Sequence, residues 1–543
     1  MKMGYQRKTL QSIGGLAVVA IVGFFALRFA IASGIGLNPD SIHYLDSASY
    51  IAGGQGYATP FYNYQHPLPV REYIRQIKRP EGLSPRQQTQ YPPLFSFALA
   101  GIVASADGGS KAIQILFPLF FGINVFLAGC LAGRMTSQNP TSIILTGILV
   151  SSAEGMLDVH TQVLSEPLFL TFMLLSLLSL SVYSETRRRT AFFLASAFAG
   201  AALLTRFVGL ALVISGALGL LLLDHRPWKK RLPSAFAYAA LASLPCLLFL
   251  LRNAFLTGSL SNRPVGWTPA GFRLLTRLLP TLSNWIFPGT DQVILPDIVR
   301  VAIRITTVLA IVGLATFLFV WRKRELAADG QKRQPNGTIF HTGLFLISYF
   351  AMSFGLIFLD KEMTFDLRIL VPAQAVFLVF LVGTVYRAGP FFVSIRTWGV
   401  RLLVAIALFH LISAGVWISV CHDRGRGYHS GVWSAPAVRD IALMVKQTPE
   451  RVPIFSNSPA AVKALSDRYA YYLPFVSSSD SLSVVQKSLS SSGPAVFVFF
   501  METARLDAGG LPVEAAKSKA LYLTQLRLTL VRENDAGVLF RLD

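Results

Sequence analysis

The sequence has few charged residues for its length. Of its 543 residues only 14% are charged, whereas a soluble globular chain carries about 25%. The hydrophobic share is 53% and the mean hydropathy is +0.51, and the apolar residues gather in blocks of about 20, the length that crosses a hydrocarbon core. The composition therefore excludes an ordinary water-soluble protein and predicts a polytopic α-helical membrane protein.

Cysteines and nucleotide-binding glycines are also scarce. Cys130, Cys246 and Cys421 are widely spaced and form no metal-ligand motif, so they argue for neither a zinc site nor a disulfide framework. The sequence contains no glycine-rich nucleotide-binding fingerprint, no repeat of fixed period and no low-complexity tract. The absence of a repeat and of a low-complexity tract does not itself point to a function.

Positive charge is present in excess, with a net charge of +21. The basic residues lie in short clusters between apolar blocks, which is the pattern of cytoplasmic loops and not of nucleic-acid binding. Lys2, Arg7 and Lys8 precede the first apolar block, which has no clear cleavage site and is long for a signal core. We expect an uncleaved anchor, a cytoplasmic N-terminus and no nucleic-acid partner.

The apolar blocks predict about eleven transmembrane helices, an odd number that places the C-terminal region outside. The shorter stretch 92–106 is predicted to be a re-entrant or interfacial helix. The predicted spans are residues 10–33, 111–134, 138–157, 162–183, 190–206, 207–223, 233–251, 298–320, 338–359, 369–387 and 399–419.

Two outer segments are too long to be simple connections, residues 34–91 and everything after residue 420. The tail alternates between strand-like and helix-like runs, which predicts a small α/β domain outside the membrane. We expect a transmembrane domain over 1–420, which includes the outer loop 34–91, and an extracytoplasmic domain over 421–543. The strand-like runs are 452–456, 495–500, 528–531 and 538–542, and the helix-like runs are 460–465 and 513–526.

The first outer loop combines carboxylates with tyrosines. A sugar site needs hydrogen-bonding side chains and flat aromatic surfaces, and a sugar transferase needs a carboxylate that removes a proton from the attacking acceptor. Asp40 and Asp46 are the two acids placed for this role, and Tyr44 shares a helical face with Asp40. We expect the general base to be one of these two acids, and Tyr44 and Asp46 are candidates for binding substrate.

Both acids also have a purely structural interpretation. Asp40 follows Asn38 and Pro39 just before a helical stretch, where an acid is a favoured N-cap. Asp46 can be an ordinary solvated acid on the outer face of that helix.

At these residues the chain resembles the GT-C superfamily of polyprenyl-phosphate-sugar-dependent glycosyltransferases, which includes protein mannosyltransferases and bacterial lipid A aminoarabinose transferases. The first loop supplies an acid followed four positions on by tyrosine, a glycine after a short helix, and a closing Pro-Pro-Leu. The matching positions are Asp40, Tyr44, Gly54 or Gly56, Pro92-Pro93-Leu94, Ser165-Glu166-Pro167, Leu204-Thr205-Arg206, Leu251-Arg252-Asn253, Arg368-Ile369-Leu370-Val371-Pro372 and Asp467-Arg468-Tyr469.

The resemblance implies a transferase, hexosyl or pentosyl, of the bacterial inner (plasma) membrane. Its donor is a sugar on a polyprenyl phosphate in the outer leaflet, its acceptor a glycan, lipid or protein of the cell envelope, and its general base Asp40. Many members carry a second acid where this chain has Ser41. That departure leaves a shared divalent metal open, and no other cofactor is implied.

Four further residues near predicted membrane boundaries are expected to bind substrate. Glu166 is an acid close to the end of an apolar span, where a carboxylate is costly unless it has a partner. Arg368, and with it Arg206 and Arg252, can stabilise the charge of the leaving phosphate. Helix capping by Glu166 and snorkelling of the arginines to the lipid interface are the structural alternatives.

Two other classes of function share the composition. A secondary transporter or flippase would show internal repeats and acids at mid-membrane, whereas here the acids lie near span boundaries. A scaffold that only presents the C-terminal domain would give the first loop no reason to combine an acid, tyrosines and Pro-Pro-Leu.

Overall fold

The computed structural model describes residues 2–60, 86–104, 110–223, 227–261, 266–267, 278–288, 301, 337–359, 367–387, 393–428, 435–473, 494–501 and 528–542. The chain divides into two compact units. The helical unit comprises residues 1–32, 91–95 and 111–423, and the loop–tail unit comprises residues 33–90, 96–110 and 424–543.

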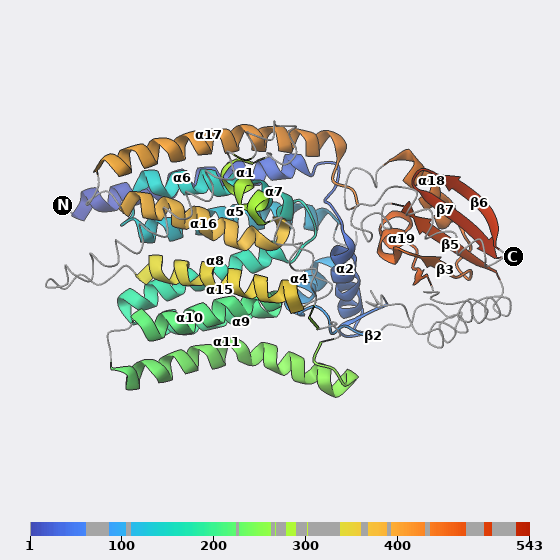
Figure 1. Cartoon of the computed structure of the whole chain (residues 1–543), viewed down its shortest axis with the longest axis horizontal. Coiled ribbons are helices and arrows are strands. Elements are labelled where there is room, and N and C mark those ends of the chain that lie inside the picture. The colour runs from blue at the N-terminus through green and yellow to red at the C-terminus, as the bar shows by residue number, and fades with distance from the viewer. Residues whose placement is uncertain are drawn as a thin grey trace. The chain divides into compact units, whose positions relative to one another are not determined.

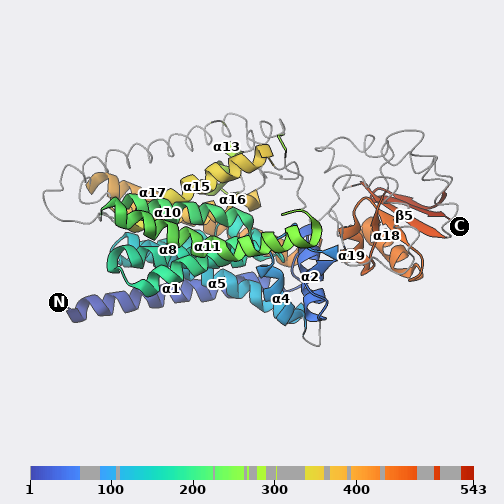
Figure 2. The same cartoon turned by 90° about the horizontal axis from the view of Figure 1, so that it is seen from below.

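The helical unit consists of long apolar helices that lie alongside one another (Figures 1 and 2). Within the described residues, seven helices are long and apolar enough to cross a membrane, and the bent pair α6 and α7, which meet at 59°, is an eighth candidate. The helices are α1 (Lys2–Ala30), α5 (Ser110–Met135), α6 (Pro140–Ser151), α7 (Glu154–His160), α8 (Glu166–Thr186), α9 (Arg189–Thr205), the 3-10 helix η1 (Phe207–Gly209), α10 (Leu210–Leu223), α11 (Trp228–Thr257), α13 (Leu278–Ile286), α15 (Gly337–Leu359), α16 (Leu367–Arg387) and α17 (Val393–Arg424).

The predicted fold class is confirmed, because the apolar blocks of the sequence are helices. Seven of the predicted spans coincide with α1, α5, α8, α11, α15, α16 and α17. The predicted span 138–157 is the bent pair α6 and α7, and 190–206 and 207–223 are the shorter helices α9 and η1 with α10. The predicted span 298–320 lies outside the described residues except for residue 301. The stretch 92–106 contains a short apolar helix, α4 (Leu94–Val103).

Local sequence explains where these helices begin and end. Asn139 accepts a hydrogen bond from the backbone N–H of Ser142, and Pro140 opens α6 in the position where proline is favoured. At the other end of a long helix, Gly258 adopts φ 73° directly after α11, a conformation that glycine reaches without strain.

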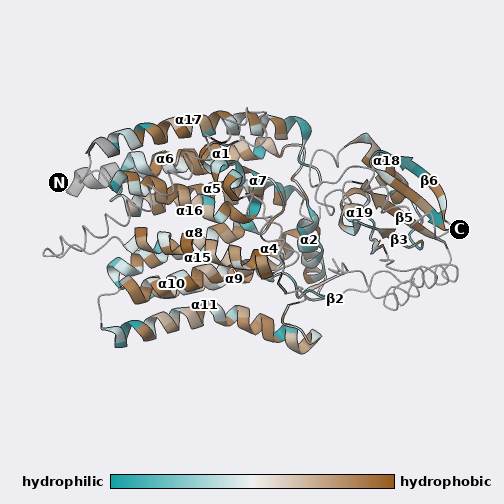
Figure 3. Cartoon of the chain, in the orientation of Figure 1, coloured by the Kyte–Doolittle hydropathy of each residue, from teal (hydrophilic) through white to brown (hydrophobic). Residues whose placement is uncertain are grey.

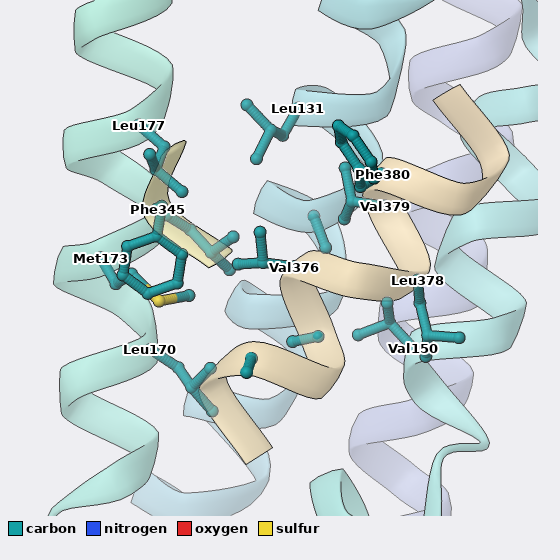
Figure 4. Close-up of a cluster of buried hydrophobic side chains, with 14 of the residues drawn as sticks. Leu131, Val150, Leu170, Met173, Leu177, Phe345, Val376, Leu378, Val379 and Phe380 are labelled. Atoms are coloured by element: carbon teal, nitrogen blue, oxygen red, sulfur yellow. The ribbon is translucent and has the colours of Figure 1, made fainter. Parts of the chain in front are cut away.

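The core of the helical unit lies around α16, the most buried of the seven candidate spans. Its most apolar window is 83% buried, against 28% for α1, α11 and α17. Figure 4 shows side chains of α16 between those of α8 and its other neighbours: Val376, Leu378, Val379 and Phe380 with Leu170, Met173, Leu177, Leu131, Val150 and Phe345.

The outer helices present apolar side chains outward. Ile21 of α1, Phe236 of α11 and Ile412 of α17 are 55%, 74% and 69% exposed, and Figure 3 shows how much of these helices is hydrophobic. Helices that are apolar on all sides are typical of membrane spans. These faces are suited to contact lipid.

The loop–tail unit is built on a mixed five-stranded sheet with strand order β4-β3-β5-β7-β6. Strand β3 is parallel to β4 and β5, and β7 is antiparallel to β5 and β6. A separate antiparallel pair, β1 with β2, closes the first loop. The elements are α2 (Pro39–Ala52), β1 (Ala58–Thr59), β2 (Arg86–Gln87), α18 (Pro436–Gln447), β3 (Ile454–Ser456), α19 (Pro459–Ser466), β4 (Tyr471–Tyr472), β5 (Ala495–Phe500), β6 (Thr529–Asn534) and β7 (Gly537–Leu542).

The α/β character predicted for the tail is seen in its described residues. Each of the four strand-like runs overlaps a strand, and the helix-like run 460–465 lies within α19. The helix-like run 513–526 lies outside the described residues.

The first loop folds together with the tail. Ile42 of α2 belongs to the same buried apolar cluster as Val438, Ile441 and Val462, and the backbone N–H of Leu37 donates to the carbonyl of Gly427 at 2.9 Å. The sequence had suggested that residues 34–91 belong with the membrane helices in a domain 1–420. By contact residues 33–90 group with residues 424–543, because α2 buries its apolar side against the tail, and the division at residues 420 and 421 stays a prediction.

Candidate active site

Helix α2 begins at an asparagine, which leaves Asp40 outside the cap. The backbone N–H of Ser41 donates to Asn38 Oδ1 at 2.9 Å, and the backbone N–H of Asn38 donates to Ser41 Oγ at 3.0 Å. This reciprocal pair is a complete capping box with Pro39 at the first helical position. The interpretation of Asp40 as the N-cap is therefore wrong, since Asn38 has that role.

Asp40 lies half-buried in the first turn of α2, where the helix dipole stabilises a negative charge. The neighbouring His43 is buried, and burial lowers its pKa to about 4 although the charge of Asp40 acts to raise it. His43 is therefore uncharged at neutral pH. Asp40 can thus act there as a proton acceptor without an imidazolium beside it.

Tyr44, one helical turn after Asp40, is only 3% exposed. Its ring is covered and helps to pack α2. Direct contact of this ring with a sugar stays a prediction.

Asp46 is on another face of α2 and is buried within the loop–tail unit. Only 6% of the residue is exposed, and the hydroxyl of Tyr469 donates to Asp46 Oδ1 at 3.3 Å. Burial raises the pKa of Asp46 to about 7, although the charge of Lys463 and this hydrogen bond act in the opposite direction. The interpretation of Asp46 as a solvated surface acid is therefore wrong.

In the helical unit, two of the three predicted arginines meet the predicted acid. Glu166 is fully buried at the first position of α8. Arg206 Nη1 lies 2.8 Å and Arg368 Nε 3.5 Å from Glu166 Oε1, and Arg206 Nη1 also donates to Ser165 Oγ at 2.9 Å. Glu166 is thus an ion-paired residue, and the capping residue before it is Ser165.

Breaks in the helices place these arginines. Arg206 is extended, with φ −150° and ψ 134°, between the end of α9 and the start of η1. Arg368 is in the first turn of α16, four residues before Pro372, and proline has no N–H to donate to the carbonyl of residue 368. The hydroxyl of Tyr349 on α15 donates to the carbonyl of Ile369 at 2.6 Å and so secures this open turn.

The cluster brings two positively charged side chains to one carboxylate. The guanidinium groups of Arg206 and Arg368 both face Glu166. Both arginine side chains keep access to solvent, with exposed fractions of 20% and 23%. Partly desolvated guanidinium groups are well suited to bind a phosphate.

A buried polar network that the sequence had not indicated lies next to Glu166. Asn124 Nδ2 donates to the carbonyl of Pro167 at 2.9 Å, and the hydroxyl of Thr171 donates to Asn124 Oδ1 at 2.8 Å. His160 Nδ1 lies 2.7 Å from the carbonyl of Met156 and must donate to it, so His160 Nε2 accepts from Asn124 Nδ2 at 3.0 Å. The network fixes the first turn of α8. The sequence feature that could have indicated this network is the presence of Asn124 and His160 within apolar segments.

Arg252, the third predicted arginine, takes part in a local arrangement on α11. Its Nη1 donates to Asn253 Oδ1 at 3.0 Å, and Asn253 Nδ2 donates to the carbonyl of Leu260 at 3.1 Å. These bonds tie the end of α11 to the residues that follow it. Substrate binding by Arg252 stays a prediction.

In the part of the chain that the structure describes, no three His, Cys, Asp or Glu side chains gather closely enough to hold a metal ion. The divalent metal that the resemblance left open stays untested.

Comparisons with known proteins agree with this architecture. Residues 90–250 match the family model of dolichyl-phosphate-mannose-protein mannosyltransferase, and no curated protein matches the chain. ArnT from Cupriavidus metallidurans in the apo state is similar in structure, with a TM-score of 0.57 and 12% identity over 97% of this chain and 98% of that one. The same protein bound to undecaprenyl phosphate gives a TM-score of 0.55 and 12% identity over 98% of both chains.

A third similar structure is the Archaeoglobus fulgidus oligosaccharyltransferase tethered with an acceptor peptide. It has a TM-score of 0.51 and 13% identity, and the match covers 93% of this chain and 72% of that one. At such identities the likeness establishes the fold. This is the fold that the resemblance of the sequence motifs had implied.

Proposed function

Because the chain has the GT-C fold, we propose that it is a glycosyltransferase that moves a sugar from a polyprenyl-phosphate donor to an acceptor. The observation that carries this proposal is the cluster in which Arg206 and Arg368 both face the buried Glu166. A set of charges in an apolar unit is costly and calls for a functional explanation. The family model matched by residues 90–250 and the ArnT structure with undecaprenyl phosphate support a lipid phosphate as the donor group.

The arginines have a defined task in this reaction. As the bond between the anomeric carbon and the phosphate oxygen breaks, negative charge develops on the departing polyprenyl phosphate. Arg368 and Arg206 stabilise that charge, while Glu166 holds both guanidinium groups in place. Arg368 is the principal phosphate ligand in this proposal.

Asp40 has the complementary task on the acceptor. An acceptor hydroxyl attacks the anomeric carbon, its oxygen forms the new glycosidic bond, and its proton passes to Asp40. The carboxylate is free of the capping role, which Asn38 fills, and it lies on a helix with a fixed start. Direct displacement by a single base fits inversion at the anomeric carbon.

The biological setting follows from the same premise. We place the chain in a bacterial inner (plasma) membrane with the N-terminus in the cytoplasm and the loop–tail unit outside. The donor is a hexose or pentose on a polyprenyl phosphate, and the acceptor is a glycan, a lipid or a protein of the cell envelope.

The direct test replaces Asp40 by Asn, which keeps the shape of the side chain and removes the base. Transfer from a polyprenyl-phosphate-linked sugar in isolated membranes is expected to fall by roughly 10² to 10⁴. The control is Asp440→Asn, which removes a partly exposed carboxylate that pairs with Arg532 on the surface of the tail. Full activity of the Asp40 variant would remove Asp40 from the mechanism.

Substrate class is tested by mass analysis of envelope glycans and polyprenyl-phosphate sugars in cells with and without the protein. We expect a lipid-linked sugar to accumulate and one glycan substituent to disappear when the protein is absent. If neither pool changes, the chain is not a transferase of this class.

A further inference from the structure

Helix α2 presents two distinct faces. Each residue of an α-helix advances by about 100° around the axis, so the angle between Tyr44 and Asp40 is about 40°, whereas that between Asp46 and Asp40 is about 120°. Ile42 lies close in angle to Asp46. The helix therefore carries the proposed base on one face and Ile42 with Asp46 on another.

The face with Ile42 and Asp46 packs against the tail inside one compact unit. Ile42 is part of the apolar cluster that contains Ile441 and Val462. Beside it, Asp46 Oδ1 accepts the hydrogen bond from Tyr469 at 3.3 Å. Apolar contact and one partly buried hydrogen bond thus join α2 to α18, α19 and the residues that follow.

The tyrosine of this contact is itself held in place. Lys463 Nζ lies 4.1 Å from the centre of the Tyr469 ring, within the range of a cation–π interaction. Lys463 also pairs with Asp467 at 2.6 Å. Asp467 ends α19 in a left-handed conformation with φ 58°. The end of α19 thereby sets the position of the phenol.

We propose that Asp46 is a positioning residue, whose hydrogen bond with Tyr469 fixes α2 on the tail domain and thereby fixes the orientation of Asp40. This inference rests on the proposed role of Asp40 as the base. It replaces the expectation that Asp46 touches the substrate, because the carboxyl group is covered and bonded within the protein.

The chemistry of the contact needs an acceptor oxygen and not a negative charge. Burial raises the pKa of Asp46 to about 7, so part of the population is uncharged at neutral pH. Asp46 Oδ2 is buried and has no hydrogen-bond partner among the described residues, and the effect of burial on the pKa exceeds the opposing effect of the Lys463 charge. An amide at this position keeps the acceptor oxygen. It should therefore preserve the hydrogen bond that joins α2 to Tyr469, which we call the tether.

The experiment measures hydrogen–deuterium exchange of the full-length protein in detergent, with mass spectrometry of peptides from α2 and from β5 and β7. Asp46→Ala and Tyr469→Phe each remove one side of the hydrogen bond. Exchange of the α2 amides is expected to rise about tenfold in both, with β5 and β7 unchanged. Asp46→Asn is expected to keep the protection of α2, and Asp440→Asn serves as the matched control.

The proposal is overturned if α2 exchanges as in the unaltered protein in both Asp46→Ala and Tyr469→Phe. It is also overturned if exchange rises equally in α2, β5 and β7, because Asp46 would then stabilise the domain as a whole. A loss of protection in Asp46→Asn equal to that in Asp46→Ala would show that the charge, and not the acceptor oxygen, is what matters.

The same measurement separates this inference from the proposed function. Asp40→Asn should stop sugar transfer and leave the exchange of α2 unchanged. If Asp40→Asn remains active while Tyr469→Phe loosens α2, the tether is real and the role of Asp40 is wrong. If Asp40→Asn is inactive while Tyr469→Phe leaves α2 protected, the base is right and the tether is wrong.

Discussion

Among the described residues each of the two units buries one carboxylate, and the two carboxylates have opposite surroundings. Glu166 in the helical unit is fully buried and faces two guanidinium groups, Arg206 at 2.8 Å and Arg368 at 3.5 Å. Asp46 in the loop–tail unit is 6% exposed and receives a hydrogen bond from the phenol of Tyr469. The surroundings of Glu166 contain opposite charges that favour its ionised form, whereas the surroundings of Asp46 allow its carboxyl group to be neutral.

The difference shows how burial can serve different ends. A charge among apolar helices is tolerated when it is paired, and pairs of this kind mark functional sites. A carboxyl group at a contact within a folded domain can instead take up a proton, which removes the need for a cation. We therefore propose that the cluster around Glu166 binds the phosphate and that Asp46 is a positioning residue.

The largest expected effect is that of removing the paired acid. Glu166→Ala leaves two guanidinium groups without their shared partner, and breaking a buried ion pair in this way costs about 3 to 5 kcal/mol. Asp46→Ala loses one hydrogen bond and should cost about 1 to 2 kcal/mol. The apparent melting temperatures of both variants in detergent compare the two sites directly. Equal losses of stability would contradict the distinction drawn between them.

The second effect is a pH dependence that belongs to Asp46 alone. Its pKa is raised from the ordinary value to about 7 in the packed state, so packing of α2 takes up a proton and is favoured at low pH. As the pH rises from about 4 to about 7, packing should weaken by up to about 1.4 kcal/mol per pH unit and then level off. Lys463, Asp467 and Tyr469 are the charged or titratable groups that act on this carboxyl group.

The measurement is exchange of the α2 amides, corrected for the intrinsic pH dependence of exchange. Asp46→Asn should abolish the dependence because an amide does not titrate in this range. A dependence that survives in the Asn variant would assign the titration to another group.

The third effect concerns the donor and compares two arginines. Arg368→Ala removes a guanidinium group of the cluster with Glu166, so the KM for a polyprenyl-phosphate sugar should rise about tenfold, which is roughly 1.4 kcal/mol. Arg252→Ala removes a group that bonds to Asn253 and should change that KM by less than about threefold. If both variants raise KM alike, the ion cluster is not the phosphate site. Quantitative immunoblotting of membranes checks insertion in each case.

The smallest expected effect tests whether Tyr349 helps to position Arg368. Tyr349→Phe removes the hydroxyl that donates to the carbonyl of Ile369, and the loss of one such bond costs about 1 kcal/mol. The apparent melting temperature should fall slightly, and the donor KM should rise by a few fold because Arg368 lies in the same turn. An unchanged donor KM would make the bond purely structural.

Several parts of the structure could be predicted because they depend on neighbouring residues. The apolar blocks gave the positions of most described helices, since a span needs only a continuous length of apolar side chains. The strands of the tail could be recognised from their apolar runs between turn residues. Capping of α2 by Asp40 was one of two interpretations, because Asn38 and Asp40 are both good N-caps, and only the observed bonds between Asn38 and Ser41 exclude it.

By itself the sequence determined that this chain is a helical membrane protein with a small α/β tail and a first loop rich in acids and tyrosines. These properties are local, because hydropathy and helix or strand preference act over a few turns. Tertiary structure alone decided that Glu166 pairs with Arg206 and Arg368, and that Asp46 is buried against Tyr469. Those partners are far apart in the chain, so only the packing of the helices and of α2 on the tail could bring their side chains together.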